Sequence, residues 1–185
     1  MNKAKVIGLI GRAGSGKDTV YEALKAALDD KTVVRVAFGD EVKREVADRH
    51  ELSVETIDAN KDKFRVLLQE WGMEYRRARD SEYWIKKIKP QMDMFLALAD
   101  VIVITDVRFI NEATYVKEVC NGSLVKVLGS ETKMLKSNHQ SETEMMDITP
   151  DYLLPNDKNN LDQLCEGITF LVNELELMEV QHNEC

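Results

Sequence analysis

The sequence has few cysteines and no long apolar run, and these absences exclude several classes of protein. Cys120, Cys165 and Cys185 are the three cysteines among 185 residues, and their odd number and wide spacing suit neither a disulfide framework nor a metal site. No apolar stretch approaches the roughly 20 residues of a membrane-spanning helix. The first five residues lead straight into an apolar segment, without the features of a signal peptide. These patterns predict a reduced, cytoplasmic protein.

An excess of basic residues is also missing. The chain has 25 Lys and Arg against 33 Asp and Glu, a net charge of −8, which argues against the basic footprint of a nucleic-acid groove. Arginine is absent from Phe109 to Cys185. The arginines are Arg12, Arg35, Arg44, Arg49, Arg65, Arg76, Arg77, Arg79 and Arg108. This concentration indicates a local anion pocket, and solvated helix faces are the alternative for several of its members.

Strand and helix patterns alternate along the chain. The expected strands are Val6–Ile10, Thr32–Phe38, Val101–Thr105, Leu124–Leu128 and Tyr152–Leu154. The expected helices are Lys17–Leu28, Glu41–Asp48, Lys61–Ala78, Glu82–Lys87, Pro90–Ala99, Asn111–Cys120 and Leu161–Met178. Such alternation predicts an α/β fold with a five-stranded parallel sheet flanked by helices. We expect one domain over residues 1–185, with a helical acceptor-binding region at about 39–100 and a lid at about 129–147.

The most informative motif is the run Gly11–Thr19, which reads Gly-Arg-Ala-Gly-Ser-Gly-Lys-Asp-Thr. An apolar strand precedes it and a helix follows, which is the context of a phosphate-binding loop. Glycines let successive N–H groups turn toward an anion, and Lys17 supplies a full charge for the β- and γ-phosphates. The expected ATP-binding residues of the loop are Arg12, Gly14, Ser15, Gly16, Lys17, Asp18 and Thr19. Asp18 replaces the usual Mg²⁺-binding Ser or Thr, and acts either on the metal through water or as an acid at a helix N-terminus.

The helical segment Lys61–Arg79 carries a polar stripe beside its apolar face. Arg65, Gln69, Gly72 and Arg76 follow the spacing i, i+4, i+7 and i+11, which aligns them on a continuous α-helix. Paired guanidinium groups suit phosphate. Glycine within a helix indicates the close approach of a ligand or backbone, or else a break in the helix. A surface helix with ordinary ion pairs is the alternative. The apolar face comprises Phe64, Leu67, Leu68, Trp71 and Tyr75.

Several separated motifs resemble the phage-type deoxynucleoside monophosphate kinases, a P-loop family. The Gly-Lys-Asp-Thr loop is similar to theirs, to that of animal phosphomevalonate kinases, and to the Gly-Lys-Gly-Thr of adenylate kinases. The segment 68–76, with the later Trp84, resembles the family's Leu-Gln-x-x-Gly-Thr-Glu/Asp segment and Trp, although Met73 replaces Thr. The segment Ala37–Lys43 resembles the family's Ala-Asp-Pro-Leu-Lys, with Lys43 in its place. Trp84 and Phe38 either stack on a base or pack in the core.

The second half of the chain extends this resemblance. The segment 106–112 matches Asp-x-Arg-x-x-Asn-Glu, which implies that Asp106 holds Mg²⁺ through water or orients the acceptor, and that Arg108 bridges the two nucleotides. A helix cap is the alternative role for Asp106, although Asn111 is better placed for it. His139–Glu142 resembles a lid element, but Leu128-Gly129 stands where the family carries Arg-Pro, so Lys133, Lys136 or Arg12 would replace that charge. The segment Tyr152–Asp157 resembles the family's last strand and Asn-Asp turn, which implies a backbone contact to the adenine of ATP near Asn156. A simple turn before a helix is the alternative.

These features predict an ATP-dependent kinase that uses ATP and Mg²⁺ to convert a deoxynucleoside monophosphate (dNMP) to the diphosphate. Catalytic roles are expected for Lys17, Arg108 and Asp106, and acceptor binding for Lys43, Arg65, Gln69, Gly72, Arg76 and Trp84. The rivals are a kinase of another small metabolite, such as phosphomevalonate, and a nucleotide-binding regulator without an acceptor. The expected partner is a small molecule rather than nucleic acid or membrane. The base preference and the pairing of two copies as a homodimer remain open.

Overall fold

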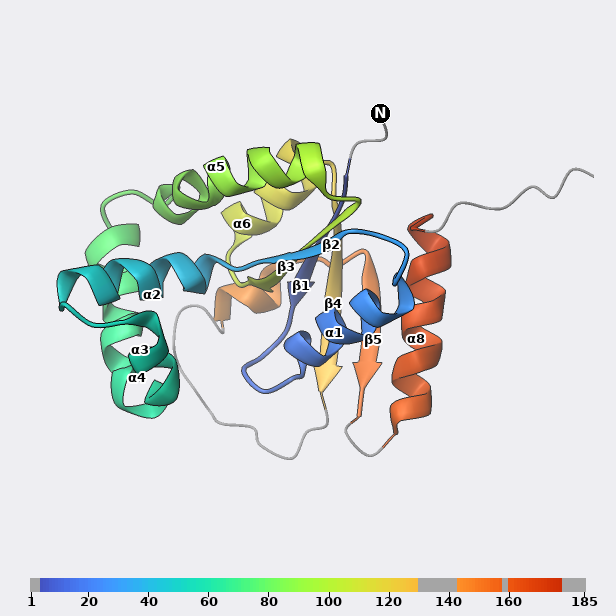
Figure 1. Cartoon of the computed structure of the whole chain (residues 1–185), viewed down its shortest axis with the longest axis horizontal. Helices are drawn as coiled ribbons and strands as arrows, with labels where there is room; N and C mark the ends of the chain where they lie inside the picture. The colour runs from blue at the N-terminus through green and yellow to red at the C-terminus, as the bar shows by residue number, and fades with distance from the viewer. Residues whose placement is uncertain (1–3, 130–142, 158–159, 178–185) are drawn as a thin grey trace, which may run out of the picture. The chain divides into compact units, whose positions relative to one another are not determined.

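A five-stranded sheet organises the larger part of the chain in the computed structural model, which describes residues 4–129, 143–157 and 160–177 (Figure 1). The strands are β1 (Lys5–Ile10), β2 (Val33–Val36), β3 (Val101–Val107), β4 (Ser123–Gly129) and β5 (Tyr152–Asn156). Their order is β2-β3-β1-β4-β5, and β1 pairs in parallel with β3 and β4, as β4 does with β5. All five predicted strands are therefore present.

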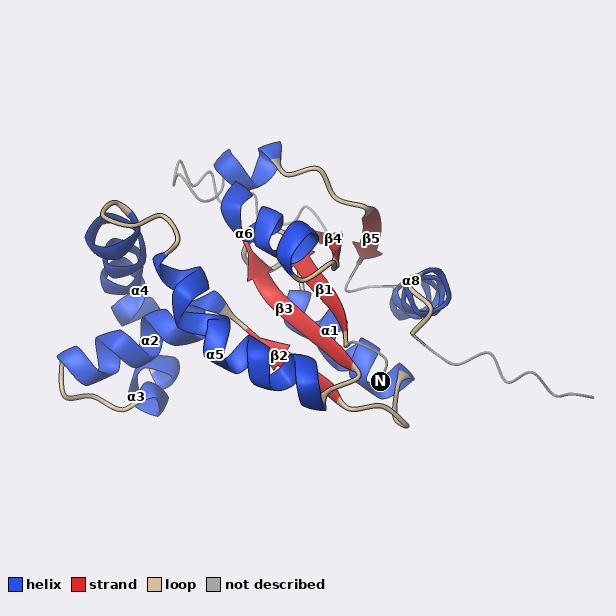
Figure 2. Cartoon of the chain, turned by 90° about the horizontal axis from the view of Figure 1, so that it is seen from above, coloured by secondary structure: helices blue, strands red, loops and turns tan. Residues whose placement is uncertain are grey.

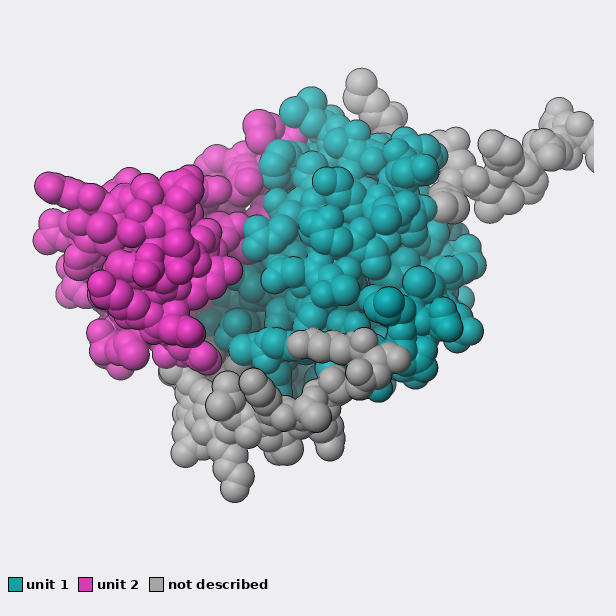
Figure 3. Space-filling view, turned by 60° about the horizontal axis from the view of Figure 1, so that its bottom comes forward, with its two compact units in different colours: residues 1–35, 95–185 teal, residues 36–94 magenta. Residues whose placement is uncertain are grey.

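The chain divides into two compact units, which Figure 3 colours separately. Unit 1 comprises residues 1–35 and 95–185, and unit 2 comprises residues 36–94. Unit 1 holds the phosphate-loop motif, and unit 2 covers most of the region expected to bind the acceptor.

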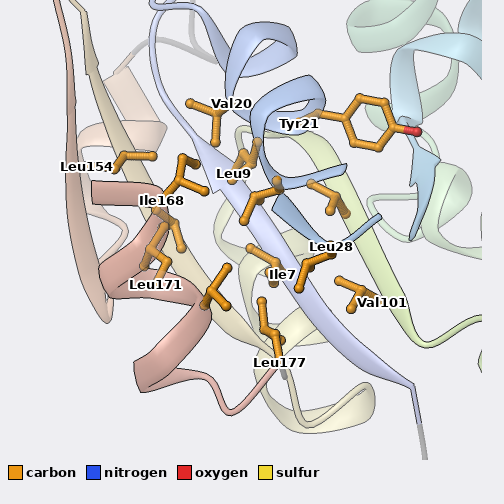
Figure 4. Close-up of a cluster of buried hydrophobic side chains, with 14 of the residues drawn as sticks. Ile7, Leu9, Val20, Tyr21, Leu28, Val101, Leu154, Ile168, Leu171 and Leu177 are labelled. Atoms are coloured by element: carbon orange, nitrogen blue, oxygen red, sulfur yellow. The ribbon is translucent and has the colours of Figure 1, made fainter. Parts of the chain in front are cut away.

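In unit 1 the sheet lies between helices (Figure 2). One face carries α1 (Lys17–Ala27) and α8 (Leu161–Glu174), and the other carries α6 (Ile110–Thr114) with its continuation η2 (Tyr115–Val119). Apolar side chains of α1 and α8 meet those of the strands, as Leu9, Val20 and Ile168 show in Figure 4. Burial of this face stabilises the strand ends from which the phosphate loop starts.

Unit 2 is helical. It contains α2 (Phe38–Arg49), α3 (Val54–Ala59), α4 (Lys61–Glu70) and the π-helical segment η1 (Trp71–Arg77), and most of α5 (Tyr83–Leu98). Its small core surrounds Val46, Ala47 and Ile57. Four of the five predicted apolar residues of the Lys61–Arg79 segment pack against this core: Phe64, Leu67, Leu68 and Trp71.

Two points of the helix prediction need correction. The short helix α3 was not expected. Pro90 does not separate two helices, because α5 runs through it, with Trp84, Ile85, Ile88 and Met92 buried on both sides of the proline. Burial of that continuous face offsets the hydrogen bond that a proline removes.

The position of Gly122 after the Asn111–Cys120 helix predicts a cap, and its N–H does donate to the carbonyl oxygen of Val116 at 2.8 Å, although Gly122 does not have the left-handed conformation. That conformation belongs to Asn121, with φ of 53°. Gly122 instead permits a close approach of chains, because a Cβ there would lie 2.6 Å from the carbonyl oxygen of Val6. Over the described residues, no helix combines the length and the apolar character needed to cross a bilayer.

Candidate active site

The phosphate loop connects β1 to α1 in the conformation that its glycines allow. Gly14 and Gly16 have φ of 80° and 86°, a region that a side chain strongly disfavours. Gly16 is also the N-cap of α1, so the helix begins at Lys17 with its first N–H groups at the loop. Gly11 differs from them, because its role is close approach: a Cβ there would lie 2.6 Å from Ser15 Oγ.

Lys17 folds back across the loop. Its ammonium group donates hydrogen bonds to the carbonyl oxygens of Gly11 at 2.6 Å and Arg12 at 2.9 Å. A cation is therefore held over the loop, where it can contact phosphate oxygens.

Asp18 and Thr19 lie at the start of α1. The Asp18 carboxylate is 86% exposed and lies 3.9 Å from the Arg35 Nε. An exposed acid in a first helical turn fits the helix-dipole role, and the metal role stays a prediction.

Asn156 ends β5, and its side chain contacts the loop. Its side chain is buried, with 4% exposed, and its amide donates to the carbonyl oxygens of Ser15 at 2.9 Å and Gly16 at 3.3 Å. The sequence predicted an adenine contact through the backbone here and missed this side-chain bond, since nothing local to residue 156 indicates a partner 140 positions away.

Asp106 and Arg108 lie at the carboxyl end of β3, which extends two residues beyond its predicted end. Both side chains are half-buried. Asn111 is not the cap of the next helix, because the N-cap is Phe109. The buried Glu112 binds this turn, accepting hydrogen bonds from the N–H groups of Arg108 at 2.9 Å and Phe109 at 3.2 Å.

A magnesium ion fits this half of the site only as a partner of phosphates and water. No group of three or more potential metal ligands occurs in the part of the chain that the structure describes. Mg²⁺ commonly binds through one or two carboxylates plus substrate phosphates and keeps several waters. Asp18 and Asp106 remain the carboxylates expected to meet it, directly or through water.

In unit 2, Lys43 lies on α2 between two carboxylates. Its ammonium is 2.8 Å from Asp58 Oδ1 and 3.4 Å from Asp40 Oδ1. Burial opposes the charge on Lys43, but the hydrogen bond to Asp58 and the attraction of both acids outweigh it and raise the pKa of Lys43. The two carboxylates therefore favour the charged form of Lys43.

Arg76 also has an acidic partner, Glu45 of α2, with which it forms an ion pair. Glu45 further accepts hydrogen bonds from Trp71 Nε1 at 3.2 Å and from the Tyr83 hydroxyl at 2.7 Å. Burial opposes the Glu45 charge, but the hydrogen bonds from Tyr83, Arg76 and Trp71 prevail and lower its pKa. Sequence reasoning missed Glu45, because its partners lie 26 to 38 positions away.

Aromatic rings surround the Arg76 guanidinium. Its central carbon is 5.6, 5.2 and 5.0 Å from the ring centroids of Trp71, Tyr75 and Tyr83. The rings of Trp71 and Tyr75 stack, with centroids 4.7 Å apart. Tyr75 was predicted on the apolar face, yet it is 43% exposed and adds to an accessible aromatic and cationic surface.

The predicted alignment of four polar residues along one helix edge is wrong beyond residue 70. Arg65 and Gln69 lie in α4, whereas Gly72 and Arg76 lie in η1. A π segment, bonded i to i+5, winds more slowly than an α-helix, so spacing derived for an α-helix does not carry across it. The glycine marks this change of winding.

The close approach expected at Gly72 is not crowded, because a Cβ there would only touch Val42 at ordinary distances. Its carbonyl oxygen accepts a hydrogen bond from Trp84 Nε1 at 2.9 Å. Trp84 is 3% exposed and Phe38 is 4% exposed. Their burial favours core packing over stacking on a base for both residues. The lid residues 133, 136, 139, 141 and 142 lie outside the described residues.

The parallel sheet, the glycine loop and the lysine that follows it define a P-loop kinase, an ATP-dependent phosphotransferase. Residues 9–122 match the family model described as phosphomevalonate kinase, and the chain belongs to this family. The chain is therefore a kinase of a small metabolite. No curated protein matches the sequence.

Solved structures agree on the fold. The Thermus thermophilus protein TT1252 superimposes with a TM-score of 0.53 at 15% identity, over 94% of this chain and 99% of that one. A sugar kinase from Janibacter sp. gives 0.52 at 14% identity, over 96% and 99%. At such identities the similarity defines architecture rather than substrate.

Proposed function

We propose that the protein transfers the γ-phosphoryl group of ATP to a deoxynucleoside monophosphate, giving ADP and the deoxynucleoside diphosphate. The observation that carries this proposal is the surface around Arg76, where one guanidinium and three aromatic rings come together. A guanidinium suits a phosphate, and aromatic faces suit a planar base. The sequence resemblance to the phage-type kinases supports the same substrate class.

In this proposal, one set of cations binds ATP and another binds the acceptor. In unit 1, Lys17 and the loop N–H groups bind the ATP phosphates, and Arg108 neutralises the charge that develops on the transferred group. In unit 2, Lys43, Arg65 and Arg76 bind the acceptor phosphate, with Gln69 and Gly72 beside them. Bound Mg²⁺ would neutralise charge on the β- and γ-phosphates.

The chemistry needs no protein base. An oxygen of the acceptor phosphate is already ionised at neutral pH and attacks the γ-phosphorus, while the bond from that phosphorus to the β–γ bridging oxygen breaks and ADP leaves. Positioning and charge neutralisation therefore suffice.

Phosphomevalonate is the second candidate acceptor, because the family model that matches residues 9–122 bears that name. It too offers a phosphate to Lys43 and Arg76, but it has no ring to meet Tyr75.

The test is ADP release from ATP with each of the four dNMPs, the four ribonucleotides and phosphomevalonate. We expect acceptor-dependent release with at least one dNMP, and a higher KM for it in Arg76→Lys, since lysine lacks the planar fork. Release with phosphomevalonate alone would select the second candidate. ADP release that no acceptor accelerates would exclude both.

A further inference from the structure

The last rung of the β4–β5 ladder supports the phosphate loop. Gly129 and Asn156 are register partners at the ends of these strands. A Cβ on Gly129 would lie 2.7 Å from Ser15 Cα, and a Cβ on Gly16 would lie 2.0 Å from Asn156 Nδ2. Both partners therefore touch the same short piece of loop, Ser15–Gly16, at distances that only glycine permits.

The Asn156 bonds fix the direction of two peptide groups. In a planar trans peptide the C=O and the following N–H point in opposite directions. Asn156 holds the carbonyl oxygens of Ser15 and Gly16 toward the end of β5, and the Gly16 oxygen also accepts the Val20 N–H at 3.0 Å as the first acceptor of α1. The N–H groups of Gly16 and Lys17, which share those peptide planes, then point away from Asn156, where they are available to an anion.

We propose that Asn156 is a positioning residue for the phosphates of ATP, which acts by aiming the N–H groups of Gly16 and Lys17. Its side chain touches loop carbonyls and need not touch the nucleotide. This role differs from the adenine contact that the sequence resemblance implies, and it depends on ATP binding rather than on the identity of the acceptor.

The main test is the Kd for ATP of Asn156→Ala, measured by calorimetric titration without any acceptor. Loss of two buried hydrogen bonds predicts binding about tenfold or more weaker. The matched control is Asn160→Ala. Asn160 caps α8 by accepting from the Gln163 N–H at 3.1 Å, so its loss lowers thermal stability without reaching the loop. We expect its Kd for ATP to stay within twofold of the parent.

A second variant separates positioning from packing. Asn156→Asp keeps the shape but places an acceptor against two carbonyl oxygens when ionised, and it regains one O–H donor when protonated. The ratio of its Kd for ATP to that of the parent should exceed tenfold at pH 8 and fall toward pH 5. If Asn156→Ala does not fold, this pH series decides the matter.

Two results would overturn the proposal. One is a Kd for ATP of Asn156→Ala within twofold of the parent. The other is a Kd ratio of Asn156→Asp that does not change with pH. Since acceptors are absent from both titrations, neither result bears on the dNMP assignment.

Discussion

At the scale of single residues, Lys17 links the loop to catalysis. Its ammonium bonds two loop carbonyls in the described structure, and in the proposed mechanism it contacts the β- and γ-phosphates. Lys17→Ala should lower kcat/KM by about a hundredfold or more, in line with the loss of a preorganised charge at the transition state. The exposed Lys25→Ala, on the same helix, is the control and should keep near-parental kcat/KM. Near-normal turnover of Lys17→Ala would remove the residue from its role.

Glu45 gives a pH-dependent prediction. Its pKa is lowered in the folded chain, so its ion pair stabilises the protein above the ordinary carboxyl pKa of about 4.3, and this stabilisation is lost as pH falls through the lowered value. Glu45→Gln should be less stable than the parent by about 1–3 kcal/mol at pH 7. The gap in urea unfolding should close below pH 4.

The exposed Glu70→Gln is the matched control for Glu45 and should stay close to the parent throughout. A gap for Glu45→Gln that is constant from pH 7 to pH 3 would contradict the ion-pair explanation.

Sequence reasoning succeeded at residues whose role is local and failed at those whose partners are remote. The backbone conformations of Gly14 and Gly16 were predicted, because a phosphate-binding loop requires glycine at such positions. Glu45 and the Asn156 amide were not, because each acts through groups that folding alone brings near it.

At the scale of elements, the turn from β3 into α6 depends on one buried carboxylate. Glu112 is 2% exposed and accepts two main-chain N–H groups, those of Arg108 and Phe109. Glu112→Ala would remove the acceptor of both these hydrogen bonds, at a cost of about 1–3 kcal/mol in the free energy of unfolding. Urea unfolding measures it, with the exposed Glu118→Ala as control. An equal decrease in the free energy of unfolding of both variants would show that the hydrogen bonds of Glu112 do not stabilise the turn.

Helices were easier to predict than their winding. Apolar spacing predicts where the Lys61–Ala78 helix lies, and the packing of Phe64, Leu67 and Leu68 agrees. The spacing cannot show that the helix changes from α to π after Glu70, because similar residue types occur in both kinds of helix. The strands were better defined, because a continuously apolar, β-branched run such as Val101–Ile104 suits a strand buried on both faces.

At the scale of the whole molecule, catalysis is expected to need a divalent cation that arrives with ATP. Since Mg²⁺ commonly binds through one or two carboxylates plus substrate phosphates, binding without nucleotide should be weak. Chelation with EDTA should abolish ADP formation, and added Mg²⁺ should restore it fully. Calorimetry with Mg²⁺ alone should detect no tight site, and micromolar binding without ATP would contradict this view.

The fold class was predictable as a whole because the alternating pattern and the glycine loop point to the same sheet. The division into residues 1–35 with 95–185, and residues 36–94, was only suggested by a long strandless stretch. Residue spacing does not predict the contacts that make residues 36–94 a compact unit.

Gly129 also bears on how this sequence can change over time. The phage-type kinases that this sequence resembles carry Arg-Pro where this chain has Leu128-Gly129, and the Cα of Ser15 fills the space that a side chain on Gly129 would need. Any side chain at position 129 would displace the phosphate loop, whatever its own chemistry could contribute. Position 129 is therefore constrained by the phosphate loop as well as by the strand that it ends, and it tolerates a larger residue only if the loop moves too.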